Sequence, residues 1–473
     1  MDHPHLLRIG GAWRGADDGA TFTVREPATG AAIAAVPRAG ARECRAAIAA
    51  AVDAQAAWRE ESVKRRGAVC HAIADRLMAA RPALARLRAR EGGTALATAL
   101  AEVEYAAGFF RFYGDEIGRL AGRTIVHPDP RRRVRVEHVP IGVVGAITPW
   151  NLPLAAPAKK LAPAIAAGCA MVLKPSELTP LSALAIAREA ELAGLPPGVL
   201  NVVCGDAAAI GGELTGNPAV RALAFTGSTR VGRQLMAACA PGLKRVALEL
   251  GGSAPFVVFA DADLERAADD CAALKTANAG QVCVTANRVL VERPVHDRFV
   301  ALLVDRLRGV RLGDPLDAAT TMGPLISDEA AERVAALVAG AVAQGAIAAL
   351  GGARSGAFHP PMVLTGCRND WPIAREEIFG PVAPVIAFDG EAEALALAND
   401  TPYGLAAFAY TGDADRQHRL ARALEAGVVG INDPRPLIPS APFGGVKQSG
   451  IGREGGSEGL LEYLDAKLIG VRE

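Results

Sequence analysis

Short apolar runs alternate with helical segments through the middle of this 473-residue chain, and this alternation limits the folds open to it. The runs lie at 143–147, 171–173, 200–203, 222–225 and 246–250, and a second set begins at 255–259 and continues through 288–291 and 428–431. Strands that alternate with helices favour a parallel, doubly wound sheet. Two successive sets therefore predict two α/β domains, in keeping with a chain too long for one comfortable core.

The segments around these sets follow other patterns. Residues 41–118 are rich in Ala, Arg and Glu with apolar residues at helical spacing, which predicts a helical block. The turn residues Pro128-Asp129-Pro130 stand between two strand-like runs, so we expect a two-stranded arm over 123–137. The closing stretch, 462–471, is expected to form an edge strand.

The charge balance excludes two classes of partner. Lys plus Arg and Asp plus Glu both number 51, so the net charge is zero and no electrostatic footprint for nucleic acid or an anionic membrane is present. The basic run 131–135 is interpreted as a solvated face. Two uncharged stretches, 138–158 and 334–353, are long enough to cross a membrane, but their prolines, Asn151 and Gln344 favour pieces of soluble helix and strand.

The cysteines and the first residues predict the compartment. Eight Cys occur without a C-x-x-C pair, and the eight His form no H-x-x-x-H pattern, so we expect no structural metal and a reducing environment. Residues 1–5 lack a basic segment followed by an apolar one, which gives no support for secretion. A cytoplasmic location is expected.

Three segments carry candidate chemistry. Cys283 can act as a nucleophile, and Glu249, 34 positions upstream, can activate water, which together indicate a covalent acyl mechanism. The segment 148–153 contains Asn151, whose amide could support an oxyanion. Singly, a Cys is most often a small buried hydrophobe and a Glu before a Gly pair a solvated strand end. The three together favour catalysis.

Four motifs extend this pattern: 248–252, 280–283, 376–381 and 442–445. In this order and spacing, the chain resembles the aldehyde dehydrogenase superfamily over nearly all its length. The resemblance implies an NAD-binding domain at 1–122 and 139–248, a catalytic domain at 249–440, and oligomerisation or bridging elements at 123–138 and 441–473. These last elements are edge strands that need covering, so a homodimer or homotetramer is expected.

The resemblance also implies a mechanism. The Cys283 thiolate would attack an aldehyde, the Asn151 amide and the Cys283 N–H would hold the oxyanion, and hydride would pass to the nicotinamide. Glu249 would then activate water to hydrolyse the thioester, and Lys160 and Glu454 would belong to a proton relay. The presence of Glu249 favours hydrolysis to a free acid over transfer of the acyl group to coenzyme A. A non-catalytic relative that acts as a binding or structural protein is the alternative.

The cofactor site is expected where a strand, a Gly turn and a helix start follow one another at 224–232, because free N–H groups there suit a pyrophosphate. The literal G-x-G-x-x-G at 450–455 follows no strand and is rejected. By resemblance, Glu177 would accept from a ribose hydroxyl and repel a 2′-phosphate, which favours NAD, with NADP possible. The expected cofactor contacts are Ile147, Thr148, Pro149, Trp150, Lys174, Ser176, Glu177, Gly211, Phe225, Gly227, Ser228, Val231, Leu250, Glu377 and Phe379.

The substrate class is predicted from positions at which this chain differs from the proteins that it resembles. Residues 399–406 and 444–456 resemble succinate semialdehyde dehydrogenases, which hold the distal carboxylate of their substrate with two arginines and a serine. Here Lys159, Ala277 and Ile438 stand at those positions. An apolar or aromatic aldehyde is therefore predicted, with a semialdehyde as the alternative. The tunnel is expected to be lined by Leu152, Lys159, Val282, Val284 and Phe443, with Phe112 nearby.

Overall fold

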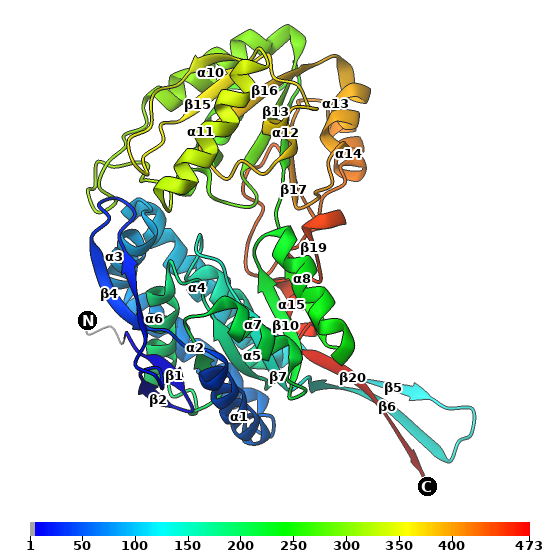
Figure 1. Cartoon of the computed structure of the whole chain (residues 1–473). Helices are drawn as coiled ribbons and strands as arrows, with labels where there is room; N and C mark the ends of the chain where they lie inside the picture. The colour runs from blue at the N-terminus through cyan, green and yellow to red at the C-terminus, as the bar shows by residue number, and fades with distance from the viewer. Residues whose placement is uncertain (1–4) are drawn as a thin grey trace.

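The computed structural model describes residues 5–473; residues 1–4, at the start of the predicted NAD-binding domain, lie outside the described part. Two lobes, each built on a mostly parallel sheet, face one another, and a narrow arm projects from the lower lobe (Figure 1). This architecture confirms the predicted α/β class with two parallel-sheet domains.

The lower lobe contains an eight-stranded sheet of order β19-β11-β10-β7-β8-β9-β1-β2. Five central strands are parallel, and β19, β1 and β2 add antiparallel edges. The strands span β1 Leu7–Ile9, β2 Ala12–Arg14, β7 Val143–Ile147, β8 Ala170–Lys174, β9 Leu200–Val202, β10 Val220–Thr226, β11 Arg245–Glu249 and β19 Gly450–Ile451.

The helices of this lobe are α1 Ala41–Trp58, α2 Val63–Ala79, α3 Arg81–Gly92, α4 Leu96–Glu116, α5 Ala155–Ala167, α6 Pro180–Leu192, α7 Ala207–Gly216, α8 Thr229–Cys239 and α15 Gly456–Leu461, with short 3₁₀ turns η1 Ile117–Arg119 and η2 Ala240–Gly242. The helical block predicted over 41–118 is confirmed by α1 to α4. All thirteen residues of α5 are buried, so this helix forms the centre of the lobe and carries its two lysines into the interior.

Four N-terminal strands were not predicted. In addition to β1 and β2, a hairpin is formed by β3 Thr21–Arg25 and β4 Ala32–Pro37. β1 joins the sheet through a single Cα pairing, Arg8 with Val202 of β9.

The upper lobe contains a seven-stranded sheet of order β14-β15-β16-β13-β12-β17-β18, parallel except for β14. Its strands are β12 Ala254–Val258, β13 Ala286–Glu292, β14 Ile347–Leu350, β15 Met362–Thr365, β16 Val382–Phe388, β17 Ala406–Tyr410 and β18 Val428–Ile431. Its helices are α9 Leu264–Thr276, α10 His296–Arg308, α11 Asp328–Ala343, α12 Pro372–Arg375, α13 Gly390–Asn399 and α14 Ala414–Ala423, with η3 Ala277–Gly280, η4 Arg293–Val295 and η5 Lys447–Ser449.

The arm is one antiparallel sheet of β5 Arg123–Val126, β6 Arg132–Pro140 and β20 Leu464–Arg472. β20 pairs with β6 along its whole length, so the predicted two-stranded arm and closing edge strand form a single unit. Val126 is 94% and Leu468 66% exposed, and apolar side chains this open on an edge sheet need a cover.

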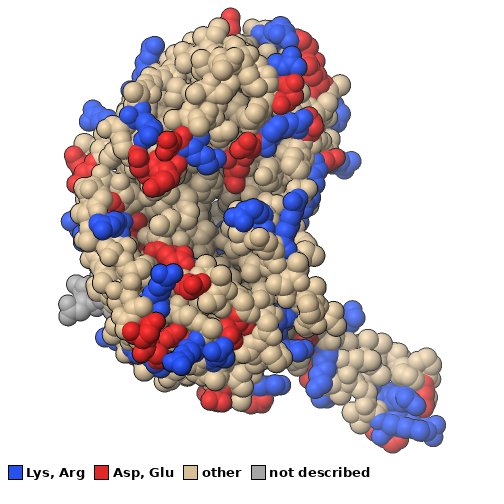
Figure 2. Space-filling view, viewed as in Figure 1, with Lys and Arg blue, Asp and Glu red and all other residues tan. Residues whose placement is uncertain are grey.

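Charged residues of both signs are interspersed over the face in Figure 2, and a hollow opens between the two lobes. This distribution agrees with the balanced composition and shows no large single-sign field on this face.

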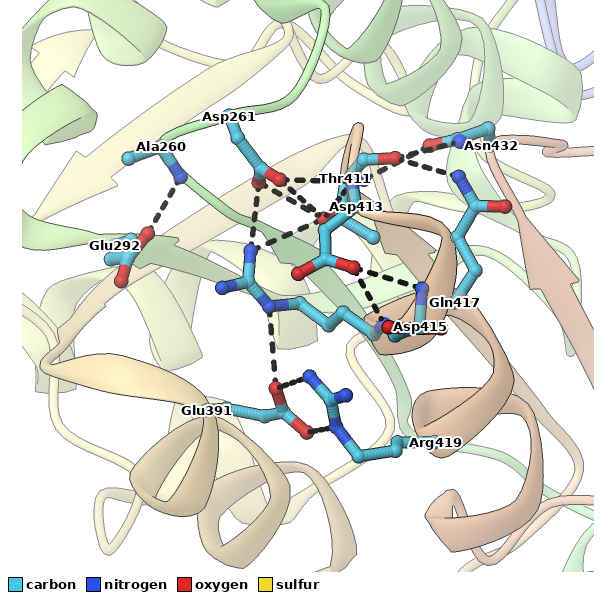
Figure 3. A network of polar contacts seen from close by, with 11 residues as sticks. Ala260, Asp261, Glu292, Glu391, Thr411, Asp413, Asp415, Gln417, Arg419 and Asn432 are labelled. Carbon is cyan, nitrogen blue, oxygen red and sulfur yellow. Dashed lines mark hydrogen bonds and ion pairs between the residues drawn. The ribbon is translucent and has the colours of Figure 1, made fainter.

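A polar network braces the upper lobe (Figure 3). Arg416 of α14 donates to Asp261 after β12 (2.9 Å) and to Glu391 of α13 (3.3 Å), and Arg419 binds Glu391 through two bonds of 2.7 Å. Thr411 donates to Asp261 at 2.9 Å. The network fixes two helices against the sheet and leaves the opposite end of the strands free for a site.

Candidate active site

A cavity of about 390 Å³ lies between the lobes, at the carboxyl ends of β7, β10 and β11. This size and this position are typical of small-molecule sites in α/β folds. It is lined by Pro149, Trp150, Asn151, Leu152, Ala156, Lys159, Thr226, Gly227, Ser228, Leu250, Gly251, Gln281, Cys283, Ala330, Arg333, Glu377, Phe379, Phe443 and Glu454.

Cys283 faces this cavity. All eight cysteines are free, but only Cys283 is not fully buried. The backbone before it turns through three left-handed residues, Asn278 (φ 48°), Ala279 (φ 54°) and Gly280 (φ 72°). A Cβ on Gly280 would lie 2.2 Å from the Gly380 carbonyl oxygen, so this position requires glycine. Such a costly run persists where the surroundings hold it, as at functional sites.

The protonation of the thiol depends on its surroundings. Burial in the protein raises the pKa of the Cys283 thiol to about 12, and the nearby ammonium of Lys159 acts most strongly in the opposite direction. Because the thiolate is the nucleophile, catalysis requires a base or a positive charge to favour it. The cavity supplies both kinds of group.

Glu249 ends β11 and is 4% exposed. Its Oε2 has no hydrogen-bond partner among the described residues. Burial raises the pKa of Glu249 well above its ordinary range, Glu454 adds to this rise, and the ammonium groups of Lys160 and Lys159 oppose it. A buried carboxyl with a raised pKa and a free oxygen is suited to a general base.

Lys160 and Glu454 lie together, although they are far apart in the sequence. Lys160 is fully buried, forms an ion pair with Glu454, and donates to Thr226 Oγ1 at 2.5 Å. Glu454 lines the cavity, whereas Lys160 lies behind it. The pair can therefore relay a proton between the interior and the cavity.

The adjacent lysine, Lys159, is differently placed. Its Nζ lies 4.0 Å from the ring centre of Phe443 and 5.7 Å from those of Tyr105 and Phe109. No acceptor in the described part of the chain lies within hydrogen-bond distance, and the Glu454 Oε2 atom is 4.0 Å away. Burial disfavours the charged form, but the groups Tyr105, Glu454, Cys283 and Glu249 outweigh it and raise the pKa of Lys159. It is a charged group held by ring faces.

Asn151 lies in the loop after β7, where it is 6% exposed and lines the cavity. Its Nδ2 donates to the carbonyl oxygen of Gln281 at 3.0 Å. An amide nitrogen has two N–H donors, so one remains for an oxygen atom in the cavity.

Several expected cofactor residues meet at the same cavity. Trp150 and Phe379 stack edge to face with ring centres 5.4 Å apart, and Phe379 has a left-handed φ of 52°. Glu377 accepts from the Gly252 N–H at 3.2 Å, and burial raises its pKa to about 7. Ser228 caps α8 by accepting from the Val231 N–H at 3.4 Å. Pro149, Gly227 and Leu250 complete this group.

Other expected cofactor residues lie outside this cavity. Lys174 donates to Glu177 at 2.7 Å, so the two groups predicted to hold ribose hydroxyls pair with each other directly after β8. The remaining members that do not line the cavity are Ile147, Thr148, Ser176, Gly211, Phe225 and Val231. Phe225 packs against Leu248 and Leu250 in a small apolar cluster.

Of the five predicted substrate contacts, Leu152, Lys159 and Phe443 line the cavity. The structure places Val284 in the core of the upper lobe and packs Val282 against that core. Phe112 packs against the core of the lower lobe. These three side chains do not line the cavity.

The cavity includes six residues that sequence reasoning missed: Ala156, Thr226, Gly251, Gln281, Ala330 and Arg333. Gly251 and Gln281 lie inside motifs already singled out, and Thr226 precedes the expected glycine turn, so motif neighbours carried a usable signal. Ala330 and Arg333 come from α11, whose sequence has no motif. Arg333 donates to the carbonyl oxygen of Glu377 at 3.3 Å.

No helix within residues 5–473 is both long and apolar enough to cross a membrane. No cluster of three or more His, Cys, Asp or Glu side chains suited to a metal ion occurs there.

Comparison with known proteins identifies the family. The model of the aldehyde dehydrogenase family matches residues 13–469. A glutarate-semialdehyde dehydrogenase of Pseudomonas aeruginosa is 47% identical over 98% of this chain and 96% of its own length, and an NADP(+) succinate-semialdehyde dehydrogenase of Escherichia coli is 46% identical with the same coverage. A crystal structure of an aldehyde dehydrogenase from Brucella melitensis superposes with a TM-score of 0.98 at 45% identity, over 99% of this chain and 97% of that one. A betaine aldehyde dehydrogenase from Staphylococcus aureus in complex with NAD+ gives 0.97 at 37% identity, over 99% and 95%. The chain belongs to the aldehyde dehydrogenase family.

Proposed function

We propose that this protein oxidises an aldehyde to its carboxylic acid, with NAD as hydride acceptor and Cys283 as the covalent nucleophile. The observation that carries this proposal is the meeting of Cys283, Asn151 and Glu377 on one cavity, together with Glu249, which is buried outside the lining but whose charge acts on the Cys283 thiol. These groups come from both lobes, and each suits a separate step of one reaction.

The cavity fits the nicotinamide end of the cofactor. Glu377 presents a carboxylate that can accept from ribose hydroxyls, and Trp150 and Phe379 offer ring surfaces beside it. Gly227 lies at the start of α8, where backbone N–H groups suit a phosphate. When bound, the cofactor supplies the acceptor for hydride. Glu177 beside Lys174 favours NAD, with NADP possible, because a carboxylate there repels a 2′-phosphate.

Cys283 begins the chemistry by forming a bond from its sulfur to the aldehyde carbon. The carbonyl oxygen becomes an oxyanion, and the free N–H of Asn151 and the backbone N–H of Cys283 stabilise it. In other enzymes one such donor contributes roughly 10²- to 10³-fold in rate. The thiol proton leaves through Glu249, whose charge acts on the Cys283 thiol, or through the Lys160–Glu454 pair, whose Glu454 lines the same cavity.

The second half of the reaction releases the acid. After hydride leaves the carbon, Cys283 carries the acyl group as a thioester. Glu249 takes a proton from water, the water oxygen bonds to the acyl carbon, and the sulfur departs. The free Oε2 of Glu249 can accept that proton, which supports hydrolysis and a non-acylating enzyme rather than transfer to coenzyme A.

The decisive experiment uses Cys283→Ala. With an aldehyde panel and NAD, formation of the reduced cofactor should fall by about 10³-fold or more, because no acyl intermediate can form. NAD affinity should stay within about twofold of the wild type, since the thiol contributes no group to hold the nucleotide. Turnover near the wild-type rate would refute the covalent route.

One observation favours a narrower substrate class, a short aldehyde that carries an acidic group. Lys159 presents its ammonium to the cavity, and this group has no hydrogen-bond acceptor among the described residues. A substrate carboxylate or sulfonate could pair with it. The relatives named for glutarate and succinate semialdehydes act on substrates of this kind. Lys159→Met should then lower kcat/KM for succinate semialdehyde by about tenfold or more and leave hexanal and benzaldehyde nearly unchanged. If hexanal or benzaldehyde is the better wild-type substrate, the apolar aldehyde predicted from the sequence is correct.

The remaining parts of the proposal concern the whole molecule. We assign residues 1–122 and 139–248 to cofactor binding and 249–440 to catalysis. The elements 123–138 and 441–473 would join subunits of a homodimer or homotetramer, because the arm exposes apolar side chains such as Leu468. We also propose a cytoplasmic location, since seven of the eight free thiols are buried without partners in a disulfide.

A further inference from the structure

A buried ion pair lies outside the cavity, between α3 and α4. Arg88 is 1% and Glu102 5% exposed, and Arg88 Nε donates to Glu102 Oε2 at 2.7 Å. Neither residue lines the cavity. Removing two charges from water costs several kcal/mol per ion, which their attraction offsets only when further hydrogen bonds satisfy the remaining groups. Their other partners therefore indicate what the pair does.

Those partners belong to the segment that carries Asn151. Arg88 Nη2 donates to the backbone oxygen of Asn151 at 2.8 Å. Glu102 Oε1 accepts from two backbone N–H groups at the start of α5, those of Leu154 at 3.0 Å and Ala155 at 3.2 Å. The pair thus holds the middle and the C-terminal end of the loop between β7 and α5, which carries the Asn151 side chain.

The same guanidinium reaches the segment that carries Cys283. Arg88 Nη2 also donates to Asn278 Oδ1 at 3.2 Å. Asn278 Nδ2 in turn donates to the backbone oxygens of Asn151 (3.2 Å) and Gln281 (3.3 Å), and Asn151 Nδ2 donates to that same Gln281 oxygen. Asn278 begins the left-handed turn before Cys283. A closed set of hydrogen bonds therefore joins the two lobes at the point where the oxyanion donor and the nucleophile meet.

We infer that Arg88, held by Glu102, is a positioning residue that sets the place of the Asn151 amide relative to Cys283. Donors stabilise an oxyanion strongly when they are fixed before the charge develops, so a loose Asn151 loses much of its effect. The inference rests on the proposed role of Asn151 as oxyanion donor. Arg88 touches neither substrate nor cofactor and acts only through its partners.

Gly92→Ala tests this without removing a hydrogen-bonding group. A Cβ on Gly92 would lie 2.0 Å from Arg88 Nη1, an atom without a partner among the described residues, so the guanidinium must shift. Gly212→Ala in α7 is the matched control, because no atom of residues 5–473 other than its chain neighbours and its own helix backbone lies within 4 Å of a Cβ built there. The measured quantity is the rate of the first burst of reduced cofactor after rapid mixing with aldehyde and NAD.

We expect Gly92→Ala to slow the burst by about tenfold and Asn151→Ala by about 10²-fold or more, with Gly212→Ala unchanged. The double variant Gly92→Ala/Asn151→Ala should be no slower than Asn151→Ala alone, because residues that act as one unit are not additive. NAD affinity and alkylation of Cys283 by iodoacetamide, which forms no oxyanion, should stay within about twofold in Gly92→Ala.

Two results would overturn the inference: an unchanged burst in Gly92→Ala, or losses that multiply in the double variant. Arg88→Lys provides an independent check, because it keeps a charge beside Glu102 but cannot make the forked contacts to Asn151 and Asn278. It should slow the burst in the same non-additive way, even if Gly92→Ala folds poorly. A normal burst in Asn151→Ala alone would instead refute the proposed oxyanion donor.

Discussion

Affinity for NAD should decrease as the pH is lowered, because binding depends on the ionisation of Glu377. The carboxyl lines the cavity, accepts one hydrogen bond from the Gly252 N–H, and has a pKa raised to about 7 by burial. Ribose hydroxyls donate to the charged form, so binding of NAD should favour the carboxylate and draw its pKa down. Above pH 7 the Glu377 carboxyl is already ionised and can accept these hydrogen bonds. Below pH 7 the carboxyl must lose a proton first, and affinity falls.

The size of the change in Kd follows from how far binding lowers the pKa of Glu377. If the bound cofactor restores the ordinary Glu pKa of about 4.3, the Kd for NAD should rise by up to about 30-fold between pH 8 and pH 5.5. One pKa unit corresponds to about 1.4 kcal/mol, so this change is about 2 kcal/mol, within the usual range for a hydrogen bond to a charged group. A smaller rise would indicate that NAD restores the pKa only in part.

Isothermal titration calorimetry of NAD at several pH values measures this directly. Glu377→Gln should bind NAD at pH 8 about as weakly as the wild type does at pH 5.5, and its Kd should vary little with pH. Glu376→Gln is the control, because the neighbouring side chain is exposed and does not line the cavity. A wild-type Kd that is flat over this range, or a Glu377→Gln variant that keeps the full slope, would refute the reasoning.

Three further predictions address deacylation, cofactor choice and assembly. Glu249→Gln should give a stoichiometric burst of reduced cofactor followed by turnover slowed about 10²- to 10⁴-fold, because an amide cannot take a proton from water; loss of the burst in rapid mixing would make Glu249 the base for Cys283. Glu177→Ser should narrow the preference of kcat/KM for NAD over NADP, and a wild-type preference for NADP would contradict the ribose interpretation. Val126→Lys with Leu468→Lys should lower the mass measured by light scattering, because charge on the arm opposes burial between subunits; an unchanged mass would remove the arm from the interface.

The central strands of the lower lobe could be predicted because burial leaves a local trace, whereas β16 and β17 of the upper lobe were not predicted. A parallel strand covered on both faces is a continuous apolar run, and 143–147 coincides with β7 for this reason. β1 has no such trace. It is three residues long, and its place is set by pairing with β9, which lies far along the chain. A pairing between strands so far apart in the sequence cannot be predicted from local sequence.

The candidate site divides in the same way. Cys283 and Glu249 lie in segments whose residue types indicate chemistry, so sequence reasoning reached them. Arg88 lies in a helix rich in arginine, where a charged residue ordinarily faces solvent. Only the fold shows that α3 turns this side chain inward, toward Asn151. Its role depends on which segments surround it, and no motif records that.

The two adjacent lysines of α5 show how the fold gives neighbouring residues different uses. Every position of this helix is buried, so an apolar side chain at 159 or 160 would avoid the cost of burying an ammonium. Lys160 offsets that cost through Glu454 and Thr226. Lys159 has no hydrogen-bond acceptor among the described residues and is stabilised by ring faces and by the Glu454 carboxylate at 4.0 Å. An apolar aldehyde that enters the cavity offers this ammonium no hydrogen-bond acceptor. An acidic aldehyde brings the missing partner into a site of low dielectric, where a charge-assisted bond is strong. The free-energy cost of burying the Lys159 ammonium is therefore offset best when an acidic substrate is bound. This favours an acidic aldehyde over the apolar aldehyde that the absence of the arginines had suggested.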